Sequence, residues 1–473
     1  MYTSILSQVA AAAPIAPHGR WRAGRAGGLL LLLACFAFLA SGCGRQQGVA
    51  RAAGDSDQLV ITGITVVDVR TGNRLPNRSV LIAGGRISRI TTRAIAPKGA
   101  AVLDGRGLFL IPGLWDMHSH NEPLGAGSMD LYLANGVLGT RDMGSEAGFI
   151  LDLRERVRRG ELRGPTIVAA GPILDAAPPE WPFRRTVRSA SDARNAVSDL
   201  ARRGVDFIKV HDSTPRDSFF AIAKEAGARR LPVAGHVPAA VSIEEAVEAG
   251  MRSIEHLANG RIHQGCADRQ PYSLASCRSR FELLARHKVM QTPTLALYNS
   301  MPRMFAEGTI PHGEYATPEL LELWRGNRES AKVNARFLAY LRRQNEQNLR
   351  AVPDLLATGT RFLAGCDGLV PGFCLHDELE WLNRAGLSPL QALQSATINA
   401  AEFLGRSAET GSVEEGMRAD LVLLRADPLV AIRNAQTIEA VILGGRVLDR
   451  RELDRMLARR RQAGTPTERR DER

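Results

Sequence analysis

The feature that most constrains the fold of this 473-residue chain is a repeated alternation of short apolar runs with helical patterns. Eight runs rich in β-forming residues occur at 114–117, 136–140, 166–169, 207–210, 232–234, 253–254, 289–295 and 361–364. Helical patterns lie between most of them, as at 190–203, 218–228 and 243–249. Eight strands that alternate with helices predict a parallel (β/α)8 barrel, or TIM barrel, of the α/β class. A doubly wound sheet is the competing architecture, but it usually has a glycine-rich phosphate turn after its first strand, and this sequence has none there.

Short strands are also predicted on both sides of the barrel. Two β-rich segments, 79–82 and 86–90, flank Ala83-Gly84-Gly85 and predict a hairpin. Similar short segments occur near the other end of the chain, and neither part is large enough for a core of its own. We therefore predict that residues 58–111 and 409–450 together form one small β-sandwich, with the barrel between them at 112–408.

The first 42 residues are typical of an export signal. Three arginines precede an apolar run at 29–39, which is too short to span a membrane comfortably, and Ala40-Ser41-Gly42-Cys43 follows. This end resembles a bacterial lipobox, in which cleavage leaves Cys43 to carry lipid. An ordinary cleaved signal is the alternative. We predict a signal peptide at 1–42, a flexible tether at 43–57, and a bacterial protein exported to the periplasm or anchored to a membrane as a lipoprotein.

The formal net charge of +11 does not indicate a nucleic-acid partner. Many of the charged side chains lie in the C-terminal tail at 451–473, which mixes both signs and predicts a solvated helix with a frayed end. No interleaving of aromatic and basic residues marks a nucleic-acid surface. The only membrane contact that we predict is the lipid at Cys43.

The cysteines form two close pairs along the chain. Cys266 with Cys277 and Cys366 with Cys374 are candidate disulfides in an exported protein, and the sequence leaves both open. No Cys-x-x-Cys pattern occurs, which argues against a zinc site made of thiolates.

Polar side chains stand at the ends of several of the predicted barrel strands. His118 and His120 end the first run, and side chains two residues apart on a strand point to the same side. In a barrel of this kind the C-terminal strand ends meet at one face, which carries the chemistry. Imidazole and carboxylate groups gathered there predict a metal site. The other members end the fourth, fifth, sixth and eighth strands: Lys209, His236, His256 and Asp367.

The motif Pro112-Gly-x-x-Asp-x-His-x-His, with these later residues, resembles the amidohydrolase superfamily. The similarity is greatest to the branch of imidazolonepropionase-like hydrolases and prolidase-like Xaa-dipeptidases. It extends to His376-Asp-Glu-Leu, Ala396-Thr-Ile-Asn-Ala-Ala and Gly416-Met-Arg-Ala-Asp-Leu-Val-Leu-Leu, and it covers the chain from about residue 59 to residue 448. The resemblance implies the split β-sandwich, and it is specific for the superfamily but not for a substrate.

The resemblance also implies a ligand set for two divalent metal ions, with zinc expected. His118 and His120 would hold the more buried ion together with Asp367. His236 and His256 would hold the second ion. Lys209 would bridge both as a carbamate formed with carbon dioxide. The alternative for Lys209 is an ion pair with Asp206 or Asp212, but residues an odd number of places along a strand point to the opposite side.

Such a pair of metals implies hydrolysis of an amide or peptide bond in a small molecule or short peptide. The metals would turn a water into hydroxide near neutral pH, and Asp367 would carry its proton to the leaving nitrogen. His211 faces the same side as Lys209 and stands where the dipeptidase-like relatives commonly have Tyr. We expect it either to donate a hydrogen bond to the carbonyl oxygen or to position a metal ligand.

Three other functions remain open from the sequence. One is a mononuclear hydrolase of cyclic amides like imidazolonepropionase, or a deaminase, although deaminase relatives often carry a Glu three residues after the fifth-strand His, where this chain has Ala239. Another is an esterase or lactonase on the same metals, and the last is a binding protein without catalysis. The polar helical segment 298–353 is predicted to form part of a lid that selects the substrate. Arg141 and Asp142, after the second strand, are predicted to form a structural ion pair.

Overall fold

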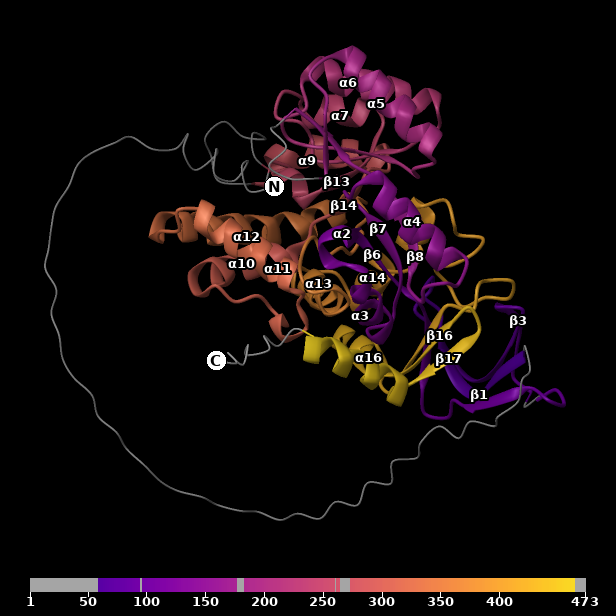
Figure 1. Cartoon of the computed structure of the whole chain (residues 1–473). Helices are drawn as coiled ribbons and strands as arrows, with labels where there is room; N and C mark the ends of the chain where they lie inside the picture. Colours follow the sequence, from indigo (N-terminus) through magenta and orange to yellow (C-terminus); the bar gives the residue numbers. More distant parts are fainter. Residues whose placement is uncertain (1–57, 94–95, 177–182, 260, 264–272, 464–473) are drawn as a thin grey trace, which may run out of the picture.

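The structure is a computed structural model, and it describes residues 58–93, 96–176, 183–259, 261–263 and 273–463 (Figure 1). The predicted signal peptide, the tether and Cys43 lie outside the described residues, as does the end of the C-terminal tail from residue 464. Among the residues that are described, no helix is long and apolar enough to cross a membrane.

The predicted α/β barrel is confirmed, and hydrogen bonds close it at two places where regular pairing stops. The Asp206 amide donates to the Ala169 carbonyl at 2.8 Å and links the third strand to the fourth. The eighth member is an irregular segment at 361–366: the Leu363 amide donates to Gln291, and Ala364 accepts from Met117. The regular strands are β6 (Leu114–Ser119), β7 (Val137–Asp142), β8 (Thr166–Ala169), β11 (Ile208–Val210), β12 (Val233–Gly235), β13 (Met251–Glu255) and β14 (Met290–Thr292).

Two short strands, which the sequence did not predict, extend the barrel wall after β8. β9 (Ile173–Asp175) pairs in parallel with β11, and β10 (Arg184–Thr186) pairs in parallel with β9. Three-residue strands are too short for an apolar period to reveal them. They bring Arg184 next to the strand ends.

Helices cover the outside of the barrel, as an amphipathic pattern requires. In α5 (Ala190–Arg203) the buried residues Ala193, Ala196, Val197 and Leu200 recur at helical spacing, and Ser189 with Asp192 forms a capping box at its start. The other helices that enclose the barrel are α2 (Asn121–Leu124), α3 (Met129–Ala134), α4 (Ala147–Arg158), α6 (Arg216–Ala228), α7 (Ile243–Glu248), α9 (Leu274–Arg286), α13 (Phe373–Arg384), α14 (Pro389–Ser395) and α15 (Ile398–Phe403).

Strands from both ends of the chain form one β-rich domain, which confirms the predicted pairing of the two ends. β5 (Phe109–Pro112) pairs antiparallel with β15 (Leu421–Leu424), and Ile111 lies opposite Val422. This seam joins segments that are far apart in the sequence, and Figure 1 shows the domain beside the barrel. The remaining strands of this eight-stranded sheet are β1 (Gln58–Val67), β2 (Arg74–Ala83), β3 (Arg86–Thr91), β4 (Ala101–Asp104), β16 (Ile438–Leu443) and β17 (Arg446–Asp449).

The segment predicted as a lid is helical, and it forms α10 (Leu295–Glu307), α11 (Pro318–Ser330) and α12 (Ala335–Ala357). These helices extend to one side of the barrel in Figure 1. Phe305, at the end of α10, packs edge-to-face on Phe337 of α12 with ring centroids 5.2 Å apart. The role of these helices as a lid stays a prediction.

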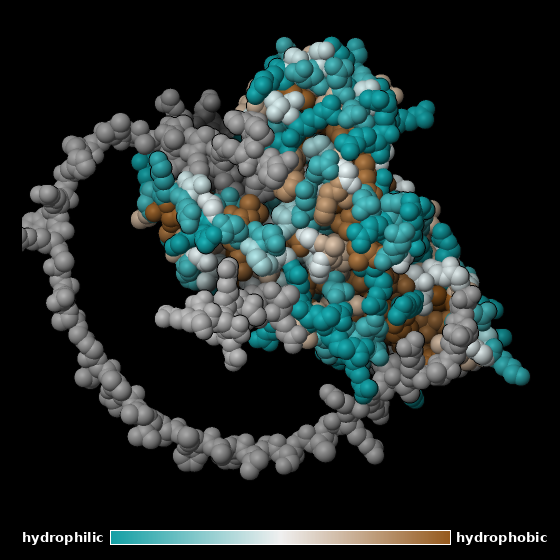
Figure 2. Space-filling view, in the orientation of Figure 1, coloured by the Kyte–Doolittle hydropathy of each residue, from teal (hydrophilic) through white to brown (hydrophobic). Residues whose placement is uncertain are grey.

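The charged C-terminal tail is ordered as helix α16 (Arg450–Ala463) over its described part. Leu453 and Met456 are fully buried, and the helix lies against α3, so this part of the tail is docked rather than free in solvent. The visible face of the molecule around it is mostly hydrophilic (Figure 2).

Glu378, on α13, is a fully buried carboxyl group in this core. Its Oε2 accepts a hydrogen bond from the Ala296 amide at 2.7 Å, which ties α13 to the start of α10. Burial raises the pKa of Glu378 to about 8, because the charged form loses its hydration. The side chain is therefore mainly protonated in the folded protein near neutral pH.

We predict that Glu378→Gln reduces the pH dependence of stability between pH 5 and 8. In the unfolded chain Glu378 ionises near its ordinary pKa, so the folded state binds more protons over this window and stability falls as pH rises. Gln cannot ionise, so the variant should gain stability relative to wild type as pH increases. Denaturant unfolding at several pH values measures this, with the exposed Glu329→Gln as control; a constant difference between Glu378→Gln and wild type would contradict the prediction.

Candidate metal centre

The six strand-end residues that the sequence singled out lie together around one cavity at the C-terminal face of the barrel. His118 lies on β6, Lys209 on β11 and His236 directly after β12. All six are buried, with no more than 7% of any residue exposed. His120, His256 and Asp367 complete the wall, together with His211, Ile173 and Arg184.

Asp367 lies at the centre of three of the imidazoles. Its Oδ1 is 3.3 Å from Nε2 of His120 and 3.6 Å from Nε2 of His118, and its Oδ2 is 3.4 Å from Nε2 of His256. Neither Oδ2 of Asp367 nor Nε2 of His256 has a hydrogen-bond partner among the described residues. Buried nitrogen and oxygen atoms that converge without partners fit a bound cation.

The other ring nitrogen of each histidine is occupied by the protein. Nδ1 of His118 donates to Glu255 at 2.8 Å, and Nδ1 of His120 donates to the Gly144 carbonyl at 2.9 Å. The same holds for the two remaining histidines. Nδ1 of His236 lies 3.1 Å from Asp212, and Nδ1 of His256 lies 2.6 Å from the Thr294 hydroxyl. Such bonds fix the tautomer in which Nε2 keeps its lone pair, the form that binds a metal.

Burial and neighbouring charges together set the protonation of these groups. Burial lowers the pKa of His118 to about 4, and it holds the pKa of His256 well below the ordinary value. Burial acts against the carboxylate of Asp367, but the surrounding histidines outweigh it and hold its pKa well below the usual range. Burial also lowers the pKa of His236, whereas at His120 the effect of burial is outweighed by Asp367, which raises its pKa. A divalent cation requires neutral imidazoles beside an ionised carboxylate, so its binding would displace a proton from His120.

The backbone at the site adopts unusual conformations. Asp367 has a positive φ of 52°. The four residues that follow β13, from His256 to Asn259, also have φ between 49° and 57°. Left-handed turns of non-glycine residues cost energy and concentrate at functional sites. Here the turn brings Asn259 back to Asp212, to which its amide donates at 3.1 Å.

Lys209 is buried beside the histidines, and it does not form the ion pair with Asp206 or Asp212 that was the alternative to a role as metal ligand. Asp206 accepts hydrogen bonds from Arg154 and the Ala169 amide, both at 2.8 Å, and Asp212 bonds His236 and Asn259. Burial lowers the pKa of Lys209 to about 8. Gly235 provides the room, since a Cβ there would lie 2.9 Å from Cδ of Lys209.

The predicted pair of Arg141 with Asp142 is wrong. Arg141 instead donates to Glu255 at 3.0 Å, while Asp142 accepts from the Asn121 amide at 2.7 Å. Adjacent residues on a strand point to opposite sides, so the two side chains diverge. Glu255, which joins Arg141 to His118, was missed, and its place before His256 was the only signal.

We predict that Arg141→Met destabilises the metal-free protein by about 3–5 kcal/mol, because it leaves the fully buried Glu255 without its cation. Denaturant unfolding after chelation measures the loss. The matched control is Arg154→Met, whose pair with Asp206 is partly exposed and should contribute about 0–1 kcal/mol. Equal losses in the two variants would contradict a special role for the buried pair.

His211 lines the cavity beside these residues. Its ring stacks on His236 with centroids 4.0 Å apart, and its Nδ1 lies 3.3 Å from Oδ2 of Asp175. Burial holds the pKa of His211 well below its ordinary value, so the ring is neutral. His376, on α13, donates to the Asn135 carbonyl at 2.9 Å and does not line the cavity.

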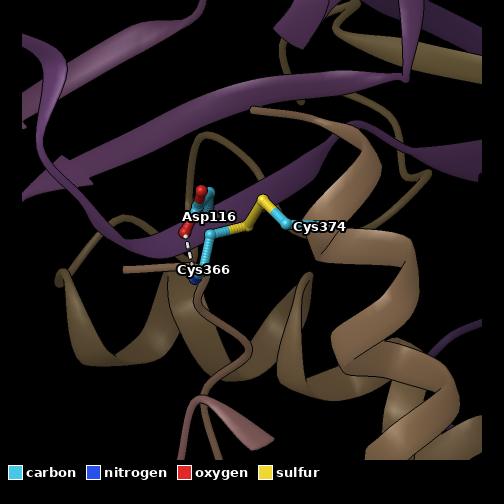
Figure 3. Close-up of side chains that lie close together, drawn as sticks. All are labelled: Asp116, Cys366 and Cys374. Carbon is cyan, nitrogen blue, oxygen red and sulfur yellow. Dashed lines mark hydrogen bonds between the residues drawn. A yellow bond between two sulfur atoms is a disulfide. The ribbon is translucent and has the colours of Figure 1, made fainter. Parts of the chain in front are cut away.

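Asp116, Cys366 and Cys374 form a further close cluster, drawn in Figure 3. Cys366 and Cys374, one of the two candidate pairs, are joined by a disulfide, which removes the thiolates that a metal would need. The Cys366 amide donates to Asp116 at 3.1 Å, so this cluster supports the backbone before Asp367. Cys277 is also disulfide-bonded, and its candidate partner, Cys266, lies outside the described residues.

A (β/α)8 barrel with buried His and Asp side chains at its C-terminal strand ends defines a metal-dependent hydrolase. A sequence profile of the amidohydrolase family matches residues 109–448. The chain therefore belongs to the amidohydrolase family, whose members it resembles in its motifs, and it is a hydrolase of carbon–nitrogen bonds.

Individual relatives agree with this assignment. Ochratoxinase of Aspergillus niger is 24% identical over 436 residues, which cover 78% of this chain and 82% of the relative. Imidazolonepropionase of Rubrobacter xylanophilus is 29% identical over 379 residues, covering 74% and 84%. A solved prolidase complexed with N-methylphosphonate-L-proline has a TM-score of 0.65 at 23% identity and covers 83% of this chain and 99% of its own. The predicted resemblance to these branches is confirmed.

Proposed function

We propose that this protein is a binuclear zinc amidohydrolase that cleaves an amide or peptide bond in a small molecule or short peptide. The observation that carries the proposal is the set of four histidines whose Nδ1 atoms are bonded to the protein while Asp367 and Lys209 complete the same cavity. Neutral imidazoles and a carboxylate are ligands that zinc accepts readily.

Each side chain has a role in this proposal. His118, His120 and Asp367 would hold one zinc ion, and His236 and His256 would hold the other. Lys209 would serve both: its neutral amine would add to carbon dioxide and lose a proton, and the resulting carbamate would offer two oxygens that share one negative charge. The lowered pKa of Lys209, about 8, raises the share of neutral amine that this addition needs.

When bound, the ions would supply Lewis acidity and a water of lowered pKa. Asp367 would take the proton of that water and pass it to the leaving nitrogen, because its carboxylate is central and one of its oxygens has no protein partner among the described residues. The burial of the site removes bulk water, which strengthens these electrostatic effects.

His211 has two candidate roles, and its surroundings favour positioning. Oδ2 of Asp175 at 3.3 Å and Oδ2 of Asp212 at 3.9 Å both face Nδ1 of His211. They favour the tautomer with its proton on Nδ1, which leaves Nε2 as an acceptor. We propose that neutral His211 supports His236 through its ring stack, and its donation to the carbonyl oxygen remains the second possibility.

The relatives support an amide substrate and leave alternatives on the same site. The similarity to ochratoxinase and to the prolidase favours a small amide or peptide as the substrate of this chain. The similarity to imidazolonepropionase favours a mononuclear hydrolase of cyclic amides as the second candidate, but Lys209 in the cavity supports two ions. An ester or lactone would suit the same chemistry.

We further propose that the protein is exported and lipid-anchored at Cys43, as its N-terminal sequence predicts. The Cys366–Cys374 disulfide supports an oxidising compartment, where such bonds persist. A mass measurement of the protein extracted from bacterial membranes would separate the lipid-bearing form from a soluble, cleaved form.

We predict that the zinc-loaded wild type contains two ions per chain and that Lys209→Ala contains one or none. The variant loses the shared ligand, so hydrolysis should fall by more than about 100-fold. Elemental analysis and a screen of dipeptides and amides measure both quantities. The exposed Lys224→Ala is the matched control and should keep both ions and full activity. Two ions and full activity in Lys209→Ala would refute the bridge.

A further inference from the structure

Arg184 places a buried positive charge in the wall of the metal cavity. It lies on β10, one of the strands that the sequence did not predict, and its side chain is only 5% exposed. It lines the cavity together with Ile173 and the six candidate ligands. None of the metal or proton-transfer roles proposed above uses this guanidinium.

At least one hydrogen-bond donor of Arg184 is unmet within the part of the chain that the structure describes. Its Nη1 lies 3.5 Å from Oδ2 of Asp175, and its buried Nε has no hydrogen-bond partner among the described residues. Arg141, the other buried arginine of the barrel, is different, because it donates to Glu255, Ser253 and the Met117 carbonyl. A buried guanidinium with unmet donors is costly unless a ligand satisfies them.

Contacts place this guanidinium on the side of the cavity that carries His236. The Asp175 oxygen that faces Arg184 also lies 3.3 Å from Nδ1 of His211, and the His211 ring stacks on His236 at 4.0 Å. A group bound by Arg184 would therefore lie near His236, which is one of the proposed ligands of the second zinc ion. The neighbouring wall residue, Ile173, offers an apolar surface.

We propose that Arg184 binds a carboxylate of the substrate, so that the substrate is an amide whose released amino acid carries a free carboxyl group. The inference rests on the proposed function, since it assumes that the cavity hydrolyses amides. The planar fork of a guanidinium matches the two oxygens of a carboxylate, and such charge-assisted pairs are strong in a buried site. The leaving group would then be held by its charge, with its apolar part against Ile173.

The test compares zinc-loaded wild type and Arg184→Met on paired substrates. The pairs are N-acetyl amino acids and dipeptides, each offered with a free C-terminal carboxylate and as the C-terminal carboxamide. Wild type should prefer the carboxylate by about 10- to 100-fold in kcat/KM, and Arg184→Met should lose that preference while its rate on the carboxamide stays within about threefold.

Arg185→Met is the matched control, because the adjacent Arg185 bonds Asp199 at 2.7 Å instead of lining the cavity. It should keep the wild-type preference. Arg184→Lys keeps the charge without the fork and should keep part of the preference; it also serves if Arg184→Met does not fold.

Each outcome decides the proposal. Loss of the preference in Arg184→Met supports it. If Arg184→Met loses kcat/KM equally on the carboxylate and the carboxamide, carboxylate recognition is overturned and Arg184 instead positions Asp175. If wild type cleaves the carboxylate and the carboxamide equally well, carboxylate recognition is overturned but the amide-hydrolase function stands. A zinc-loaded wild type that cleaves neither member of any pair would overturn the amide-hydrolase function, and this inference with it.

Discussion

The contact between β6 and the segment before Asp367 is the constraint on which the site depends. The amides of Cys366 and Asp367 both donate to the His118 carbonyl, at 3.1 and 2.7 Å. Gly365 permits this approach, since a Cβ there would lie 2.6 Å from Cβ of His118 and 2.8 Å from its amide nitrogen. The same contact closes the barrel and sets the carboxylate of Asp367 among the imidazoles, so closure of the fold and assembly of the site are one event.

The side chains that bond the metal-facing histidines from behind determine what these histidines can bind. Glu255 joins His118 to Arg141 in the barrel interior, and Asp212 joins His236 to the left-handed turn at Asn259. These partners hold the ring nitrogens that face away from the cavity, and burial favours the neutral form of His118, His236 and His256. The cavity therefore presents imidazoles in the form that binds a cation at these three positions.

The sequence was sufficient to predict the barrel and most of the residues around its cavity, for a physical reason. Side-chain alternation on a strand and the convergence of strand ends in a closed barrel are general rules, and they apply to His118, Lys209 and Asp367 without knowledge of packing. The joining of both chain ends in one β-rich domain followed because neither end could bury a core alone.

The partners of these residues could not be predicted in the same way. Glu255 and Asp175 contact side chains that come from other strands. The sequence around each of them does not indicate which of these side chains will be its partner. The predicted pair of Arg141 with Asp142 was wrong because adjacent side chains on a strand point to opposite sides. β10, which carries Arg184, is only three residues long and gave no period to recognise.

The central claim is that residues far apart in the sequence form one site for two ions. Anomalous X-ray diffraction at the zinc edge, from crystals grown with zinc and bicarbonate, tests it most directly. The account predicts two anomalous peaks in the cavity, one beside His118 and His120 and one beside His236 and His256, with continuous density from Lys209 between them. A single peak, or density at Lys209 that ends at a free amine, would contradict it.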